Sequence, residues 1–378
     1  GGLHEVVDAH AAAAPEAPAA RDQSGGLWSY RELREASLRV AARLRCQGLG
    51  GSAPPARWEE RPAAPRPLAT RLPRGREWYA LCVAAWRLGL PVAAASEDLP
   101  RGAAAEERWA RILQELRPVA AVVEDAAAGG LPGLPEDCLV LLSSELWAAP
   151  PPAAAPAPGA SLPDAPLCYA YTGGSTRHSR CAVITHGMAL WEIERYPSVF
   201  SGCVGRSDTV LQYSSAYWAA AVFGQLDLAL ATGACVAFSG ASADPGDVAA
   251  ACEALGVTVL GVVPSQLRGA WPGGPETKPA SLRVVVSWAE GLPAELARRW
   301  RGRVALFELL IATEYWLSLH SDCRPWRDPA DGLERRVLEL LPGLDAVLLR
   351  EDGLPAAEGE TGELLLAGPA VFPGYVGA

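Results

Sequence analysis

Basic charge and long apolar runs are scarce in this chain of 378 residues. The net charge of -10 leaves no basic surplus to follow a phosphate backbone, so we expect no nucleic-acid partner. The most apolar stretch, residues 81–95, is interrupted by Arg87 and Pro91 and is shorter than the roughly 20 residues needed to cross a bilayer. We therefore expect no membrane span.

Paired cysteines are absent as well. The nine cysteines contain no CxxC motif, and the closest two along the chain are Cys168 and Cys181. This spacing fits neither a zinc site nor a disulfide framework, so the sequence predicts reduced thiols and a cytoplasmic location. The chain opens at Gly1 without a basic region followed by an apolar run, so we expect no secretory signal and interpret it as an internal fragment.

Two stretches rich in alanine and proline, residues 9–20 and 148–160, offer few side chains to pack and are interpreted as linkers. The organisation that we expect is a low-complexity segment (1–24), a first α/β subdomain (25–147), a Pro/Ala linker (148–164), a second α/β subdomain with a phosphate loop (165–330) and a β-rich segment (331–378).

Helical patterns alternate with short β-branched or apolar runs along most of the chain. The stretch 28–50 begins with the capping-box pair Ser29 and Glu32 and ends in glycines, which predicts a helix. The alternation predicts mostly parallel sheets with helices on both faces. Residues 346–378 instead show strands broken by DG and EGETG turns. The predicted fold class is α/β, with two layered subdomains of mostly parallel sheet plus the start of a small antiparallel β unit.

The segment 171–180, YTGGSTRHSR, is a candidate binding loop. Its glycines let backbone N–H groups approach an oxyanion, and Thr172, Ser175, Thr176 and Arg180 add donors and charge. The segment lacks the GK[ST] ending of a Walker loop, and a plain turn is the alternative interpretation.

Seven blocks in order along residues 25–378 resemble the acyl-adenylate-forming superfamily of AMP-dependent synthetases and ligases. YTGGSTRHSRCAVITH is similar to the family signature YTSGSTGxPKGVxxTH, LLIATE to YGPTE, and GETGELLLAGPAVFPGYVG to GExGELxIxGxxVFxGYxG. The superfamily includes acyl-CoA synthetases, luciferases and adenylation domains of nonribosomal peptide synthetases. The resemblance implies that a small carboxylic acid and ATP form acyl-AMP and pyrophosphate, with Mg²⁺ as cofactor and CoA or a carrier protein as a possible acceptor.

The resemblance also implies roles for individual residues. Thr313 would act in catalysis by touching the α-phosphate, and Glu314 would act in catalysis by ligating Mg²⁺; a solvated helix-cap carboxylate is the alternative for Glu314. The other residues carried over are the ATP phosphate contacts Thr172, Gly174, Ser175, Thr176 and Arg180, the adenine-slot residues Ala289, Glu290, Leu310 and Ile311, and the substrate-pocket residues Tyr217, Trp218, Ala220 and Gly224.

Several positions depart from the family pattern. Arg177 and Cys181 replace loop glycines, and a Cβ is costly there if the backbone needs a positive φ. Leu310 and Ile311 replace a Tyr-Gly pair and threaten the room for adenine. Trp288 replaces a glycine, and three roles stay open for it: a substitute stacking ring, a block to the nucleotide, or a core side chain.

Ala220 stands where amino-acid-activating members carry an aspartate that pairs with the substrate amine. A buried ammonium without a partner is costly, so we expect an apolar acid rather than an α-amino acid. Tyr217 and Trp218 are either part of that apolar pocket or ordinary core residues.

The ribose-binding aspartate and the catalytic lysine of the family lie beyond residue 378, and Lys278, the single lysine here, falls outside the matching blocks. We therefore expect the C-terminal lid domain to be absent. The alternative function is a catalytically degenerate adenylation-like domain, which would bind nucleotide weakly or serve as an interaction module in a multidomain synthase.

Overall fold

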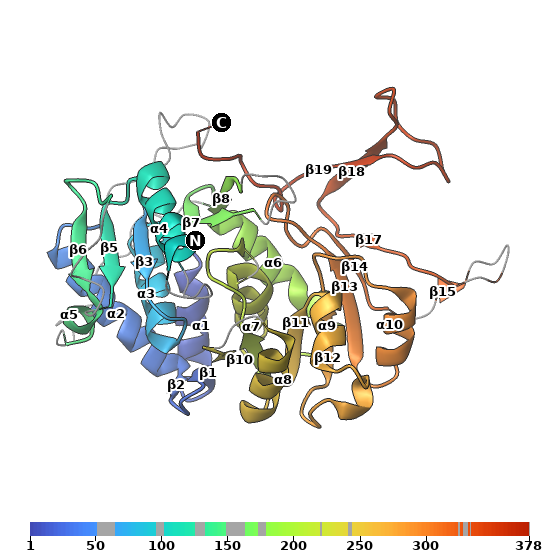
Figure 1. Ribbon diagram of the computed structural model, residues 1–378, viewed down its shortest axis with the longest axis horizontal. Helices are drawn as coiled ribbons and strands as arrows, with labels where there is room; N and C mark the ends of the chain where they lie inside the picture. Colours follow the sequence, from blue (N-terminus) through green and yellow to red (C-terminus); the bar gives the residue numbers. More distant parts are fainter. Residues whose placement is uncertain are drawn as a thin grey trace.

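Two β-sheets with helices packed against them form most of the described structure (Figure 1). Several residues with expected roles lie outside the described residues: Gly174, Ser175, Thr176, Arg177 and Ala220. The same holds for 149–162, most of the expected linker. The computed structural model describes residues 1–50, 65–95, 102–124, 133–148, 163–172, 179–219, 221–240, 244–323, 326–327, 332 and 334–377.

The larger sheet has nine strands among the described residues, and its central strands run parallel. The strands at its two edges pair in antiparallel fashion. Its central strands are buried on both faces, as expected for parallel strands covered by helices. In spatial order the strands are β17 (Glu339–Leu340), β14 (Leu319–Ser321), β13 (Ala305–Leu310), β12 (Val284–Ser287), β11 (Val259–Val262), β9 (Thr209–Gln212), β10 (Cys235–Phe238), β1 (Pro18–Asp22) and β2 (Leu27–Ser29).

The smaller sheet has six described strands, which are parallel except for the last pair, β7 and β8. In spatial order they are β6 (Leu139–Leu142), β5 (Ala120–Val123), β3 (Leu68–Arg71), β4 (Val92–Ala94), β7 (Pro166–Tyr171) and β8 (Cys181–Thr185). The mixed α/β architecture with mostly parallel sheets confirms the predicted fold class.

The helices follow the periodicity of the sequence. Ser29 caps α2 as predicted, because its side chain accepts a hydrogen bond from the Glu32 N–H at 3.2 Å while the Glu32 carboxylate accepts one from the Ser29 N–H at 2.7 Å. The helices are α1 (His4–Ala13), α2 (Tyr30–Cys46), α3 (Arg76–Arg87), α4 (Ala103–Leu116), α5 (Ser143–Trp147), α6 (His186–Val199), the π-helix η3 (Ala221–Asp227), α7 (Leu228–Thr232), α8 (Pro245–Ala254), α9 (Pro264–Ala270), the 3₁₀ turn η4 (Pro275–Thr277) and α10 (Ala294–Trp300).

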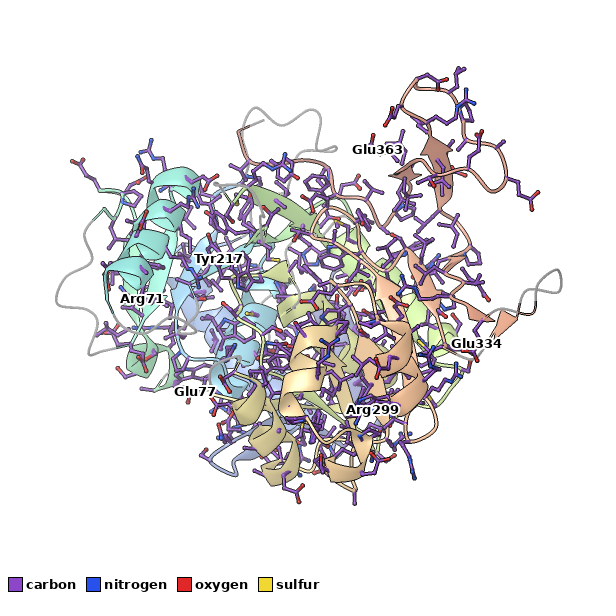
Figure 2. All side chains as sticks on the ribbon, turned by 45° about the vertical axis from the view of Figure 1, so that its right-hand side comes forward. Arg71, Glu77, Tyr217, Arg299, Glu334 and Glu363 are labelled. Atoms are coloured by element: carbon purple, nitrogen blue, oxygen red, sulfur yellow. The ribbon has the colours of Figure 1, made fainter. Side chains whose placement is uncertain are left out.

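The antiparallel unit predicted near the C-terminus is present as a hairpin of β18 (Asp345–Leu349) and β19 (Glu363–Ala367). A second short hairpin pairs β15 (Trp326–Arg327) with β16 (Glu334–Arg335). The β18–β19 hairpin projects from the sheets, and its side chains stand apart from the packed body (Figures 1 and 2). Its aliphatic side chains are correspondingly exposed, Val347 by 40% and Leu365 by 44%.

The linker interpretation of residues 9–20 is wrong. Most of that stretch belongs to α1 and β1, and β1 pairs in parallel with β10. Alanine is a strong helix former, and Leu3 and Val7 anchor α1 in the core with no exposed surface. Pro18 is tolerated because it occupies the first position of its strand.

The two sheets do not divide the chain at residues 148–164. β1 and β2 join strands from the second half of the chain in the larger sheet, whereas β7 and β8 extend the smaller sheet.

All nine cysteines are free thiols. Among the described residues, no helix is both long enough and apolar enough to span a bilayer.

Candidate functional site

The ends of the candidate phosphate loop are held by hydrogen bonds between Thr172 and the 179–180 backbone. The Thr172 N–H donates to the Arg180 carbonyl at 2.9 Å, and the Arg180 N–H donates to Thr172 Oγ1 at 3.0 Å. The Ser179 hydroxyl donates to the Thr172 carbonyl at 2.7 Å. These bonds extend the β7–β8 ladder and fix where the loop leaves and re-enters the sheet.

Arg180 and Glu314, which the sequence assigns to phosphate and metal binding, lie close together. The guanidinium Nη2 is 3.7 Å from Glu314 Oε1, and the two side chains are 63% and 29% exposed. Such a partly solvated pair is weak, so either side chain can exchange its partner for a ligand at low cost. The structure thus brings Arg180, at the end of the candidate phosphate loop, close to the motif that contains Glu314.

Tyr375 completes this cluster and was not anticipated from the sequence. Its hydroxyl donates to Glu314 Oε1, and the Arg180 guanidinium carbon lies 3.9 Å from the centre of its ring. Burial, together with the hydrogen bond to Glu314, raises the pKa of Tyr375 to about 12, so the phenol stays protonated and can donate. The GYVG block that contains Tyr375 was the only signal in the sequence.

The C-terminal segment 370–376 places Tyr375 by bridging two elements. On one side, the Phe372 N–H donates to the Glu314 carbonyl at 2.9 Å. On the other, the Val183 N–H donates to the Gly374 carbonyl at 3.1 Å, and the Val376 N–H to the Cys181 carbonyl at 2.9 Å. The segment therefore ties β8 to the turn that carries Glu314.

Thr313 and Glu314 lie in a tight turn after β13, where the Ala312 N–H donates to the Tyr315 carbonyl at 2.7 Å. The Thr313 carbonyl accepts a hydrogen bond from the Trp316 indole at 3.3 Å. Glu314 does not begin a helix, so the helix-cap interpretation is wrong. Among the described residues, no group of three or more His, Cys, Asp or Glu side chains could hold a metal ion by itself. Glu314 would therefore hold Mg²⁺ together with phosphate oxygens and waters, as Mg²⁺ commonly requires.

The four residues expected around adenine differ in their exposure to solvent. Ala289 and Glu290 are exposed after β12, whereas Leu310 and Ile311 are half-buried at the end of β13. The Glu290 carboxylate accepts hydrogen bonds from the Ser265 hydroxyl at 2.8 Å and from its N–H at 3.1 Å, in the first turn of α9.

Backbone strain was considered from the sequence at Arg177 and Cys181, of which the structure describes only Cys181. Cys181 lies in the regular strand β8 and has no positive φ. Ala289 instead adopts φ 64°, a left-handed conformation that costs a non-glycine residue about 1–2 kcal/mol. The strained residue follows Trp288 directly, at the carboxyl end of β12.

The expected substrate-pocket residues fall into two groups. Tyr217 stacks on Tyr171 at 4.4 Å between ring centres, and the Arg108 guanidinium of α4 lies 4.1 Å from the Tyr217 ring centre. Trp218 packs edge-on against Tyr217 at 4.8 Å. Gly224 lies in η3 against the ring of Trp288. The pocket role of all these residues stays a prediction.

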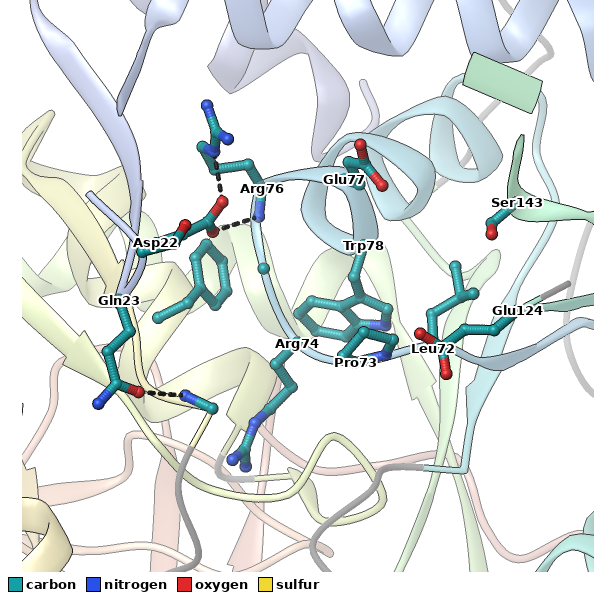
Figure 3. Close-up of a pocket in the computed structure, with 14 residues that line it drawn as sticks. Asp22, Gln23, Leu72, Pro73, Arg74, Arg76, Glu77, Trp78, Glu124 and Ser143 are labelled. Carbon is teal, nitrogen blue, oxygen red and sulfur yellow. Dashed lines mark hydrogen bonds and ion pairs between the residues drawn. The ribbon is translucent and has the colours of Figure 1, made fainter. Parts of the chain in front are cut away.

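A separate cavity of about 310 Å³ opens where strands from both sheets end (Figure 3). Two of its polar side chains pair with each other: Asp22 forms an ion pair with Arg76 and accepts a hydrogen bond from the Arg76 N–H at 3.0 Å. The Gln23 side chain accepts a hydrogen bond from the Gly240 N–H at 3.2 Å. None of the expected site residues that the structure describes lines this cavity.

A model of the AMP-binding enzyme family matches residues 7–376. The chain belongs to this family. Its relatives include the nonribosomal peptide synthetase GRA1 of Gibberella zeae, 25% identical over 99% of this chain and 4% of that protein. Another is a feruloyl-CoA synthase of Amycolatopsis sp, 30% identical over 55% of this chain and 42% of that protein. The matched regions therefore cover less than half the length of either relative.

Solved structures share the fold of this AMP-binding chain. The N-terminal subdomain of NpsA from Klebsiella oxytoca superposes with a TM-score of 0.78 at 21% identity, over 99% of this chain and 87% of that one. MatB from Rhodopseudomonas palustris gives a TM-score of 0.78 at 19% identity, over 99% and 72% of the two chains. At these identities the likeness shows the fold alone.

Proposed function

We propose that this chain takes part in the ATP-dependent activation of a carboxylic acid as acyl-AMP, with release of pyrophosphate. The observation that carries the proposal is the approach of Arg180 to Glu314 at 3.7 Å, joined by Tyr375. A cation and a carboxylate, brought together from two distant motifs at the mouth of a glycine-containing loop, suit a bound nucleoside triphosphate with its metal.

In the proposed reaction, a carboxylate oxygen of the acid attacks the α-phosphorus of ATP. The new P–O bond forms as the bond to the bridging oxygen breaks, and pyrophosphate leaves with that electron pair. Glu314 would hold Mg²⁺, which neutralises phosphate charge when bound. Arg180 adds positive charge beside the leaving group, and the Thr172–Arg180 hydrogen bonds hold the loop base in place.

Related proteins support the cofactor and the acceptor. MatB has been solved with ATP bound, and the NpsA subdomain in complex with 3-hydroxybenzoyl-AMSN. An artificial fusion joins NpsA to a PCP domain, and another relative is a feruloyl-CoA synthase. We extend to this chain the use of ATP and Mg²⁺, a carrier protein or CoA as acceptor, and a cytoplasmic location.

A second candidate function is a degenerate adenylation-like domain that acts as a weak nucleotide binder or an interaction module. The placement of Glu290 favours it, because this carboxylate caps α9 instead of standing free for a nucleotide. The aliphatic Ile311, packed against the core, favours it too.

Calorimetry with MgATP tests the proposed function directly. We expect binding by the wild-type chain, with Arg180→Ala and Glu314→Ala each weakening it. ATP–pyrophosphate exchange over short aliphatic, aryl and amino acids then tests the chemistry. If no heat is detected with ATP up to millimolar concentration, the proposal fails and the interaction module is favoured.

A further inference from the structure

Trp288 fills a slot between η3 and β11. The residue is 2% exposed, although it lies next to the exposed Ala289. A Cβ on Gly224 would lie 2.8 Å from Cη2 of the indole, and a Cβ on Gly261 would overlap the same atom. The far end of the ring therefore occupies space that side chains at these two positions would otherwise enter.

The backbone conformation does not require glycine at either position. Neither adopts a positive φ, and Gly261 lies inside β11, where glycine weakens a strand and usually marks a close approach. Both are needed here because the indole passes over them. The large apolar ring of Trp288 therefore fits in the slot because two residues distant in the sequence, Gly224 and Gly261, have no side chains.

The slot adjoins the cluster of Arg180, Glu314 and Tyr375, which we call the phosphate side of the candidate site. Trp288 follows β12, whose Ser287 pairs with Glu308 of β13, and β13 leads into the turn that carries Glu314. Phe223, next to Gly224, packs its ring against Trp316, two residues after Glu314. The indole thus lies at the carboxyl ends of parallel strands, where open α/β sheets receive ligands.

We propose that Trp288 sets the size of the acid that this chain activates, and that the substrate is a short aliphatic carboxylic acid without a ring. This inference rests on the proposed function. An aryl or long acyl group would need the space over Gly224 and Gly261, and the indole already occupies it. A short acid needs only the mouth of the slot.

Removing the indole provides a test that does not depend on catalysis. An apolar cavity made by truncating a buried side chain stays dry and takes up a matching aromatic ligand. We expect calorimetry to show indole binding by Trp288→Gly and Trp288→Ala, and none by the wild-type chain. Trp271→Gly is the matched control: Trp271 is a buried tryptophan that packs on Trp300 in another part of the core, so its truncation should also take up indole but should leave the preference among acids unchanged.

Exchange assays supply the second measurement. The wild-type chain should exchange with acetate or propionate at least about tenfold faster than with benzoate, and Trp288→Gly should shift that ratio toward benzoate by at least about tenfold. Trp288→Leu, a milder truncation, serves if the glycine variant does not fold by circular dichroism. We expect a partial shift from it in the same direction.

The outcomes separate the two proposals. If the wild-type chain binds MgATP and exchanges with short acids, but neither truncation moves the exchange ratio toward benzoate, the role of Trp288 is overturned alone, whether or not the truncations bind indole. Wild-type exchange that is fastest with benzoate also overturns it. If no variant binds MgATP or exchanges with any acid, the proposed function falls, and the substrate-size role falls with it.

Discussion

The two sides of the candidate site are built on opposite principles. On the phosphate side, Arg180 and Glu314 are polar, partly exposed to solvent and held through the 370–376 backbone. On the acyl side, Trp288 is buried in an apolar slot lined by glycine. A solvated polar cluster can receive a charged ligand without moving packed atoms, whereas a filled slot admits only what the ring leaves room for. On the proposed function, we therefore expect the chain to hold a triphosphate more readily than a bulky acid.

The largest effect is expected from Glu314→Gln, which removes the charge on the phosphate side and keeps the shape. Losing one group poised for the transition state typically costs about 10²–10³-fold in rate, and we expect a loss of that order in ATP–pyrophosphate exchange. Glu295→Gln is the matched control, because Glu295 is an exposed carboxylate on α10. Equal exchange by Glu314→Gln and the wild-type chain would refute the role of this carboxylate.

On the acyl side, Gly261→Ala should destabilise the fold. Its methyl group would collide with the indole of Trp288, and overpacking of this kind typically costs about 1–3 kcal/mol of unfolding free energy, measurable by urea denaturation. Gly302→Ala is the control, because nothing lies within 4 Å of its Cβ position. In a Trp288→Ala background the cost of Gly261→Ala should largely vanish. A cost that persists there would mean that the indole is not what demands the glycine.

A buried carboxyl joins the turn after Glu314 to α6. The Glu192 side chain accepts hydrogen bonds from the Leu317 N–H at 2.9 Å and from the Tyr196 hydroxyl at 3.0 Å. Burial raises the pKa of Glu192 from 4.5 to about 8, so in that interval the folded chain keeps a proton that the unfolded chain has released. Stability from this group is full below pH 4.5 and falls as the pH rises to about 8, by at most about 1.4 kcal/mol per unit.

Glu192→Gln should flatten this pH dependence. Burial also raises the pKa of Asp227, so part of the slope should remain in the variant. Urea denaturation at a series of pH values between 5 and 8 measures the slope for both chains. An identical slope for the two would exclude Glu192 as its source.

Local rules predicted much of the fold, and the family resemblance pointed to the two motifs that meet at Arg180 and Glu314. The Ser29–Glu32 capping box, the alternation of helix and strand and the β18–β19 hairpin depend on neighbours in the sequence, and all three were confirmed. Residues 9–20 were misread because alanine-rich composition says nothing about the tertiary partner that recruits β1 into a sheet.

Features that depend on residues far apart in the sequence could not be predicted. The role of Trp288 stayed open because its packing is decided by Gly224 and Gly261, which lie on η3 and β11. Tyr375 was overlooked because only the fold brings it to Glu314. The capping of α9 by Glu290 was missed for the same reason.

The smallest effect is expected from Tyr375→Phe, which separates the contributions within the phosphate side. The variant loses the hydroxyl that donates to Glu314 and keeps the ring beneath the Arg180 guanidinium. A single hydrogen bond contributes about 0.5–1.5 kcal/mol, so ATP binding at limiting Mg²⁺ should weaken by roughly two- to tenfold. Tyr375→Leu removes the ring as well and should lose a further factor of about two to five, which is the usual strength of an exposed cation–π contact. Calorimetry at a series of Mg²⁺ concentrations shows whether Tyr375 orients the Glu314 carboxylate for Mg²⁺ or only stabilises the C-terminal segment. If it orients the carboxylate, the loss of ATP affinity should shrink as Mg²⁺ saturates its site. A uniform loss at all Mg²⁺ concentrations would show that Tyr375 anchors the C-terminal segment without orienting Glu314.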